Sequence, residues 1–104
     1  MANASRLKLH EELCEILESE WAYYQPPASL KMNYPCIRYR KTDVNTLKAN
    51  DKNYRKVNQY ELIVIDANPD TEIPDRILDH FSMCQFDRMY TSDNLNHYVL
   101  TLYY

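Results

Sequence analysis

Glycine is absent from this chain of 104 residues. Phosphate-binding loops, dinucleotide fingerprints and nucleophile elbows all need glycine, because a side chain would block the close approach of the backbone. Most nucleotide-dependent enzyme families are therefore excluded. Turns with a positive φ must use other residues, and we expect Asp and the nine Asn to occupy them.

Large aliphatic side chains are also scarce. Leu, Ile, Val and Phe together make up 23 residues, which predicts a modest core. Ten Tyr add further apolar surface. Because Tyr combines an apolar ring with a hydroxyl that needs a partner or water, it is enriched at protein interfaces. A small core with many Tyr therefore favours a protein that assembles with copies or neighbours.

No uninterrupted apolar stretch reaches the length of a signal-peptide core or a membrane span, so we expect a cytosolic protein with no membrane partner. The net charge of −3 is too small to indicate nucleic acid as the main partner. Cys14, Cys36 and Cys84 are odd in number and widely spaced. We therefore expect reduced, mostly buried thiols and neither a disulfide framework nor a zinc site.

Hydrophobic spacing predicts one α+β domain over residues 1–104, with a mainly antiparallel four-stranded sheet and two helices packed on one face. The Leu62–Ile65 run is apolar at every position, which places its strand in the middle of the sheet. The expected helices are Ser5 to Glu20 and Glu72 to Phe81, and the expected strands are Cys36 to Lys41, Tyr60 to Asp66, Cys84 to Thr91 and His97 to Tyr104.

A polar segment at about residues 42–57 predicts a long hairpin arm between the first two strands. It is the only basic and aromatic part of the chain. We weigh three interpretations: a solvated tip, a surface that tracks a nucleic-acid strand, and an arm that lies on a neighbouring subunit. We favour the third, because the overall charge is acidic and the expected helices carry a surplus of Glu and Asp. The residues expected to make this contact are Lys48, Lys52, Tyr54, Arg55, Lys56 and Val57.

Catalytic and metal patterns are weak. Residues 66–72 resemble the start of a calcium loop, but Thr71 stands where that loop needs glycine, so turn formation and helix capping are favoured. Cys36 and His97 lack a third orienting group, and His10 and His80 show no ligand spacing. Asp75 and Asp79 share a helix face, as solvated surface residues commonly do. We expect no enzyme activity, no metal and no cofactor.

Two clusters of Tyr and Pro, Tyr23–Pro27 and Tyr34–Tyr39, frame a rigid connector. Pro26 and Pro27 have fixed backbone angles and no amide donor, which excludes a helix or a central strand. Pro26 should also push Gln25 into an extended conformation. Pro35 suits the first position of the strand that follows, in which Arg38 and Arg40 should face the wetter side of the sheet.

These clusters, the strand Tyr60–Asp66 and the closing strand resemble the small tail-terminator, or tail-completion, proteins of long-tailed bacteriophages. The resemblance covers nearly the whole chain in element order and length. It implies a structural virion protein of the tail and neck, assembled in the host cytoplasm. Such a subunit forms a ring, expected to be a hexamer, on the head-proximal end of the tail tube. There it ends tube polymerisation and joins the tail to the neck.

The implied partners are copies of the same chain, the tail tube protein and a neck or head-completion protein, with DNA only as cargo in the lumen. A ring needs two unlike patches on each subunit. The arm is one candidate, and the last strand, ending in Tyr103 and Tyr104, is the other, through main-chain pairing. The alternatives are a head-closure or neck connector protein and, in a different class, a small nucleic-acid-binding module that uses the basic arm.

Overall fold

The computed structural model describes residues 4–49 and 53–104, and it describes side-chain surroundings for residues 5–43 and 57–104. The elements follow the predicted order, with one strand added after the first helix. They are α1 (Ala4–Leu17), β1 (Ala22–Tyr24), β2 (Cys36–Ala49), β3 (Asn53–Asp66), α2 (Ile73–His80), β4 (Cys84–Ser92) and β5 (Leu95–Tyr103).

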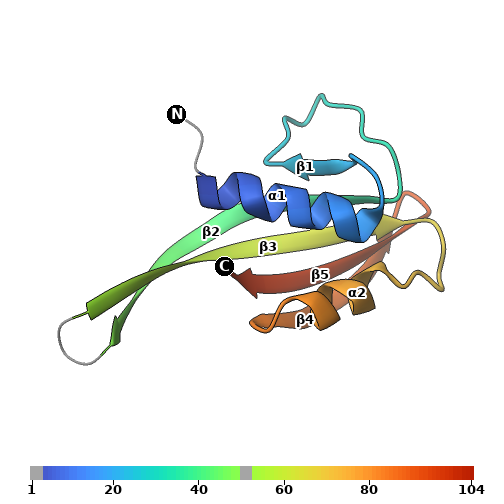
Figure 1. Cartoon of the computed structure of the whole chain (residues 1–104). Coiled ribbons are helices and arrows are strands. Elements are labelled where there is room, and N and C mark those ends of the chain that lie inside the picture. The colour runs from blue at the N-terminus through green and yellow to red at the C-terminus, as the bar shows by residue number, and fades with distance from the viewer. Residues whose placement is uncertain (1–3, 50–52) are drawn as a thin grey trace.

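The sheet has five strands in the order β1-β2-β3-β5-β4 (Figure 1). β1 runs parallel to β2 and the other pairs are antiparallel, so the sheet is mixed. The prediction of four strands missed β1, because three residues are too few to show an alternating pattern. The α+β class and the central position of β3 are confirmed.

Both helices pack on the same face of the sheet, as predicted. Leu9, Leu13 and Leu17 of α1 and Ile73 and Ile77 of α2 belong to a single buried cluster. The strand residues in this cluster are those of one alternating set, which is why one face of each strand is covered by helix. They are Ala22, Ile37, Tyr39, Tyr60, Leu62, Val64, Leu100 and Leu102.

The opposite face carries a smaller buried cluster without a helix. It consists of Cys36, Ile63, Ile65 and Val99. Residues before β2 cover it, namely Trp21, Tyr23 and Met32. Trp21, Tyr23 of β1 and Met32 of the connector between β1 and β2 therefore pack on the sheet, and residues 62–65 of β3 are buried on both faces.

Several Tyr belong to the chain's own core and make up for its few aliphatic residues. Tyr39 and Tyr60 are fully buried, and their ring centroids lie 6.3 Å apart. The centroid of the Tyr24 ring lies 5.0 Å from that of Tyr39. These tilted aromatic contacts bury large rings where Leu and Phe are scarce. The tyrosine content therefore indicates core packing as much as an interface.

Among residues 4–49 and 53–104, four have a positive φ, and two of them differ from the prediction. Asp93 and Asn94 form the turn between β4 and β5, as expected for Asx residues. Gln25, predicted to be extended, has a φ of 43°. Its N–H donates to the Tyr39 oxygen at 2.9 Å and its Oε1 accepts from the Lys41 N–H at 3.3 Å. These bonds to β2 outweigh the local preference set by Pro26.

Glu18 is the other unexpected left-handed residue, with a φ of 60° directly after α1. The N–H of Ser19 donates to the Cys14 oxygen and that of Glu18 donates to the Glu15 oxygen, both at 3.2 Å. This pair of bonds is the Schellman motif, in which the left-handed position is normally Gly. Here a residue with a Cβ occupies it, at a cost in conformational energy.

We expect Glu18→Gly to be more stable to urea than Glu18→Ala by about 1 kcal/mol, because only glycine adopts a positive φ without steric cost. The comparison cancels the exposed ion pair between Glu18 and Arg76, which both variants lose. If the urea unfolding curves of the two variants had the same midpoint and the same slope, this explanation of the end of α1 would be wrong.

Candidate functional site: surfaces around the arm

The predicted arm is a two-stranded extension of β2 and β3. Their ladder continues from the pair Asp43–Gln59 to the pair Ala49–Asn53. β5 reaches only Gln59 along β3, and β1 pairs with β2 only as far as Tyr39. The arm therefore projects beyond the helices (Figure 1), and both of its outer edges lack a strand partner among the described residues.

The basic residues predicted to make contact lie in this projection. Lys48 is opposite Tyr54, Leu47 is opposite Arg55, and Thr46 is opposite Lys56. Lys52 lies outside the described residues, and the side chains of the other four residues fall outside the described part as well. Val57 sits at the base of the arm and is only 6% exposed. It is part of the chain's own packing and is not an exposed anchor.

A hollow of about 740 Å³ lies at the base of the arm. It brings together three predicted contact residues, Val57, Tyr103 and Tyr104, with Glu12 of α1 and His80 of α2. Sequence reasoning did not include Glu12 and His80 in a site, because they belong to two separate helices. The hollow thus joins the end of β5 to both helices beside the point where the arm leaves the body.

A polar network holds this region together. Glu12 accepts a hydrogen bond from the Tyr104 hydroxyl through Oε2, and its Oε1 lies 3.0 Å from Nε2 of His80. Partial burial acts to raise the pKa of Glu12, but the hydrogen bonds from Tyr104 and His80 outweigh it and hold the pKa below its ordinary value. Burial, followed by the Glu12 carboxylate, raises the pKa of Tyr104.

The last strand is not a sheet edge, which corrects the prediction that it extends the sheet between subunits. β5 lies between β3 and β4. The Tyr103 N–H donates to the Met83 oxygen at 2.9 Å, and Tyr104 exchanges hydrogen bonds with Asn58. The backbone of these two residues is therefore already paired, because the C-terminal strand β5 is inserted between β3 and β4. Within the described residues the edges are β1 and β4.

β4 is the longer of the two edges, with nine residues against three in β1. Two large apolar side chains on it are well exposed, Phe86 at 46% and Met89 at 47%. A hollow of about 330 Å³ lies between this strand and α2, lined by Pro69, Pro74, Leu78, Phe86 and Tyr98 together with Thr71 and Asp75. We name it the α2–β4 groove. The groove could not be predicted, because its residues are distant in the sequence and a bulge between Phe86 and Arg88 shifts the register of β4.

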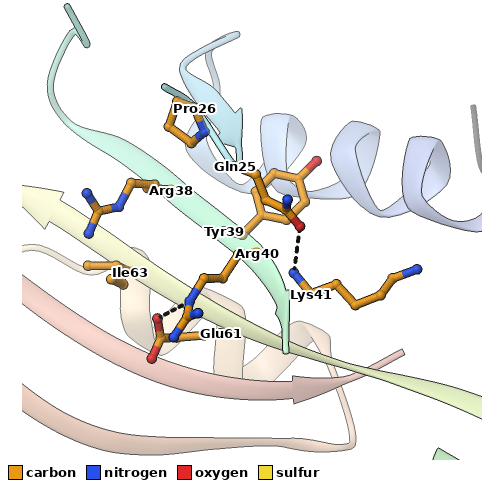
Figure 2. A pocket seen from close by; sticks show the side chains of 8 residues that line it. All are labelled: Gln25, Pro26, Arg38, Tyr39, Arg40, Lys41, Glu61 and Ile63. Carbon is orange, nitrogen blue, oxygen red and sulfur yellow. Dashed lines mark hydrogen bonds and ion pairs between the residues drawn. The ribbon is translucent and has the colours of Figure 1, made fainter. Parts of the chain in front are cut away.

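A third hollow, of about 360 Å³, lies on the sheet face opposite the helices and is cationic (Figure 2). Arg38 and Arg40 extend from β2 on the same side, whereas Tyr39 points toward the helices. Arg40 Nε lies 3.0 Å from Oε1 of Glu61. This placement agrees with the prediction that the two Arg side chains occupy the wetter face.

The remaining candidates have structural contacts. The Asp66 carboxylate accepts from the Asn68 N–H at 3.0 Å, and the Asn68 side chain accepts from the Asp70 N–H at 2.9 Å, as in Asx turns. Burial raises the pKa of the Cys36 thiol to about 12. Ile65 pairs with both Cys36 and His97, so it separates them. No cluster with metal-binding composition occurs among the described residues.

No protein-family model and no curated protein matches this chain. In the described part of the chain, neither helix is long and apolar enough to cross a membrane. Function must therefore be argued from the arm, the edge strand and the charges.

Tyr104→Phe should lower the free energy of unfolding at neutral pH by about 1 to 2 kcal/mol, because the Glu12 carboxylate loses one of its two hydrogen-bond partners and keeps only His80. The folded state lowers the pKa of Glu12, so this stability is present above the unfolded pKa. It is lost as pH falls through the folded pKa. The variant should therefore lose less stability on acidification than the unmodified chain, as measured by urea unfolding across pH 3 to 7. Parallel pH profiles would contradict this role of Glu12.

Proposed function

We propose that this chain is a structural subunit of a bacteriophage virion that assembles into a ring. In this role it closes the head-proximal end of the tail tube, ends tube polymerisation and joins the tail to the neck. The observation that carries the proposal is the projecting arm. Its two outer strand edges have no strand partner among the described residues, and the rest of the domain has a hydrophobic core of its own. The resemblance to tail-terminator proteins in the order of helices and strands gives the specific role.

The shape of the subunit fits a ring. A closed heterologous assembly needs two different patches, each of which meets the other on the next copy. The arm leaves the body at the end of the sheet where β5 stops, and the α2–β4 groove lies along the outer edge strand. These are two unlike surfaces on one chain. Subunits with two such patches can bind one another head to tail, and they form a ring when the rotations between neighbouring copies add up to a full turn.

The charges also favour contact between copies. The helix layer, residues 4–20 and 70–80, carries nine carboxylates and three Lys or Arg side chains. The arm, residues 42–57, carries four Lys or Arg and two Asp. Opposite charges on contacting surfaces speed association and favour the correct register. An arm from one copy is therefore attracted to the helix layer of another, whereas it would be repelled by a second arm.

The test is to shorten the arm without disturbing the body. Asn58 and Tyr104 exchange hydrogen bonds across β3 and β5, so alternation directs the backbone groups of Val57 toward Asn45 on β2. A two-residue Asn-Gly turn that replaces residues 46–56 therefore closes the hairpin on a hydrogen-bonded pair. We call this the arm-shortened variant.

We expect the unmodified chain to form rings, alone or on purified tail tubes, and the arm-shortened variant to remain a folded monomer. Native mass spectrometry and electron microscopy measure the assembly, and circular dichroism checks the fold. An intact ring without the arm would refute the role of the arm. A solitary unmodified chain, even beside tail tubes, would refute the proposed function.

The nucleic-acid alternative predicts a different behaviour. Binding through the basic arm would weaken steeply as salt rises, since Lys and Arg release condensed counterions from the phosphates. For a ring subunit that carries DNA only as cargo, we expect no tight binding of a short single-stranded oligonucleotide at 150 mM salt by fluorescence anisotropy, a condition near the physiological range. Tight binding that disappears in the arm-shortened variant would favour the nucleic-acid module instead.

A further inference from the structure

The α2–β4 groove lies next to an open strand edge. We propose that this groove receives the arm of a second copy of the chain, which adds its β2 edge to β4 as a further strand of the sheet. The inference rests on the proposed function and names the surface that completes the ring. Strand addition of this kind gains affinity from main-chain hydrogen bonds and specificity from pockets for alternate side chains.

The backbone of β4 has unpaired groups along its outer side. Ser92 and Leu95 close a two-residue turn, so this pair is hydrogen-bonded, as are Tyr90–His97 and Arg88–Val99 by alternation. Met89 and Thr91 lie between these pairs. Their N–H and C=O groups therefore point away from β5, where no described strand meets them. Such an edge is a template for another strand.

The arm offers a matching edge. The hydrogen-bonded pairs of the arm include Asn45–Val57 and Ala49–Asn53, so the backbone groups of Val44, Thr46 and Lys48 face outward. The pairing of β1 with β2 ends at Tyr39, and β2 continues to Ala49 with no further strand on this side in the described part of the chain, a stretch comparable in length to the nine residues of β4. The outer edge of β3 in the arm, residues 53–57, is shorter. The β2 edge is therefore the better partner for β4.

The surroundings of the groove complement the arm in polarity. The groove is lined by the apolar side chains of Phe86, Leu78 and Tyr98, and Asp75 also lines it. Asp70, Glu72 and Asp79 are exposed on and beside the same helix. The arm sequence supplies Val44 for apolar contact and Lys48 for the acidic rim, two positions that share one face of a strand by alternation. A second arm or the cationic hollow at Arg38 and Arg40 offers no such complement.

The experiment uses two kinds of defective subunit. The edge variant Met89→Pro removes one outward N–H of β4, which an edge strand tolerates because that N–H has no partner inside the sheet. The double variant Phe86→Lys with Met89→Lys keeps every N–H and places two cations where the basic arm should lie. It serves as the second edge variant if the proline substitution prevents folding. The arm-shortened variant keeps the edge and lacks the arm.

Each variant alone should be monomeric under conditions in which the unmodified chain forms rings. An equimolar mixture of an edge variant and the arm-shortened variant should form a heterodimer and nothing larger, because only one intact arm and one intact edge are present. A single contact is weaker than a closed ring, so the mixture is measured at the highest soluble concentration, by native mass spectrometry. In the unmodified ring, the amides of Met89 and Thr91 should exchange at least tenfold more slowly than in the arm-shortened monomer.

Two results would overturn this inference without contradicting the proposed ring function. In the first, the edge variants assemble like the unmodified chain. In the second, the mixture of an edge variant and the arm-shortened variant stays monomeric. Unchanged exchange at Met89 and Thr91 would also count against it. Failure of the unmodified chain to assemble, alone or on tail tubes, would instead remove the proposed function together with this inference.

Discussion

The whole architecture depends on the burial of β3 on both faces. Leu62 and Val64 face the helices, and Ile63 and Ile65 face the smaller cluster. Because side chains alternate along a strand, one run of four apolar residues joins two separate layers. Both helices, the connector before β2 and the return of β5 are positioned against this strand. The arm is a continuation of the same strand, so the rigid centre of the sheet sets the direction in which it projects.

The elements with strong periodic signals could be predicted from the sequence. The Leu spacing of α1 and the Ile spacing of α2 led to the right helices within three residues, and the apolar run led to the right end of β3, which begins at Asn53 instead of Tyr60 because the arm continues the strand. β1 could not be found, since its three residues gain their conformation from pairing with β2. The left-handed Glu18 and Gln25 were missed for a similar reason. Their hydrogen bonds to the helix end and to β2 override local preference.

The candidate surfaces were less predictable. The arm was found because its polar, basic composition is local in sequence, whereas Tyr103 and Tyr104 were predicted at an open sheet edge and lie at the end of a strand that is paired on both sides. Strand order is not local, however, and placing β5 inside the sheet moved the open edge to β4. The α2–β4 groove combines residues from four elements or turns. Only the tertiary structure brings them together.

The open edge of β4 has a consequence for how copies meet. It carries a bulge between Phe86 and Arg88 and two charged residues, Asp87 and Arg88, features that natural proteins use to discourage indiscriminate strand pairing. A head-to-tail contact that fails to close continues as an open filament. The bulge adds local twist and so fixes the angle at which a further strand can lie. In an assembly of this chain built through β4, the one-residue bulge would thus help to set the angle between copies that determines whether a ring or an open filament forms.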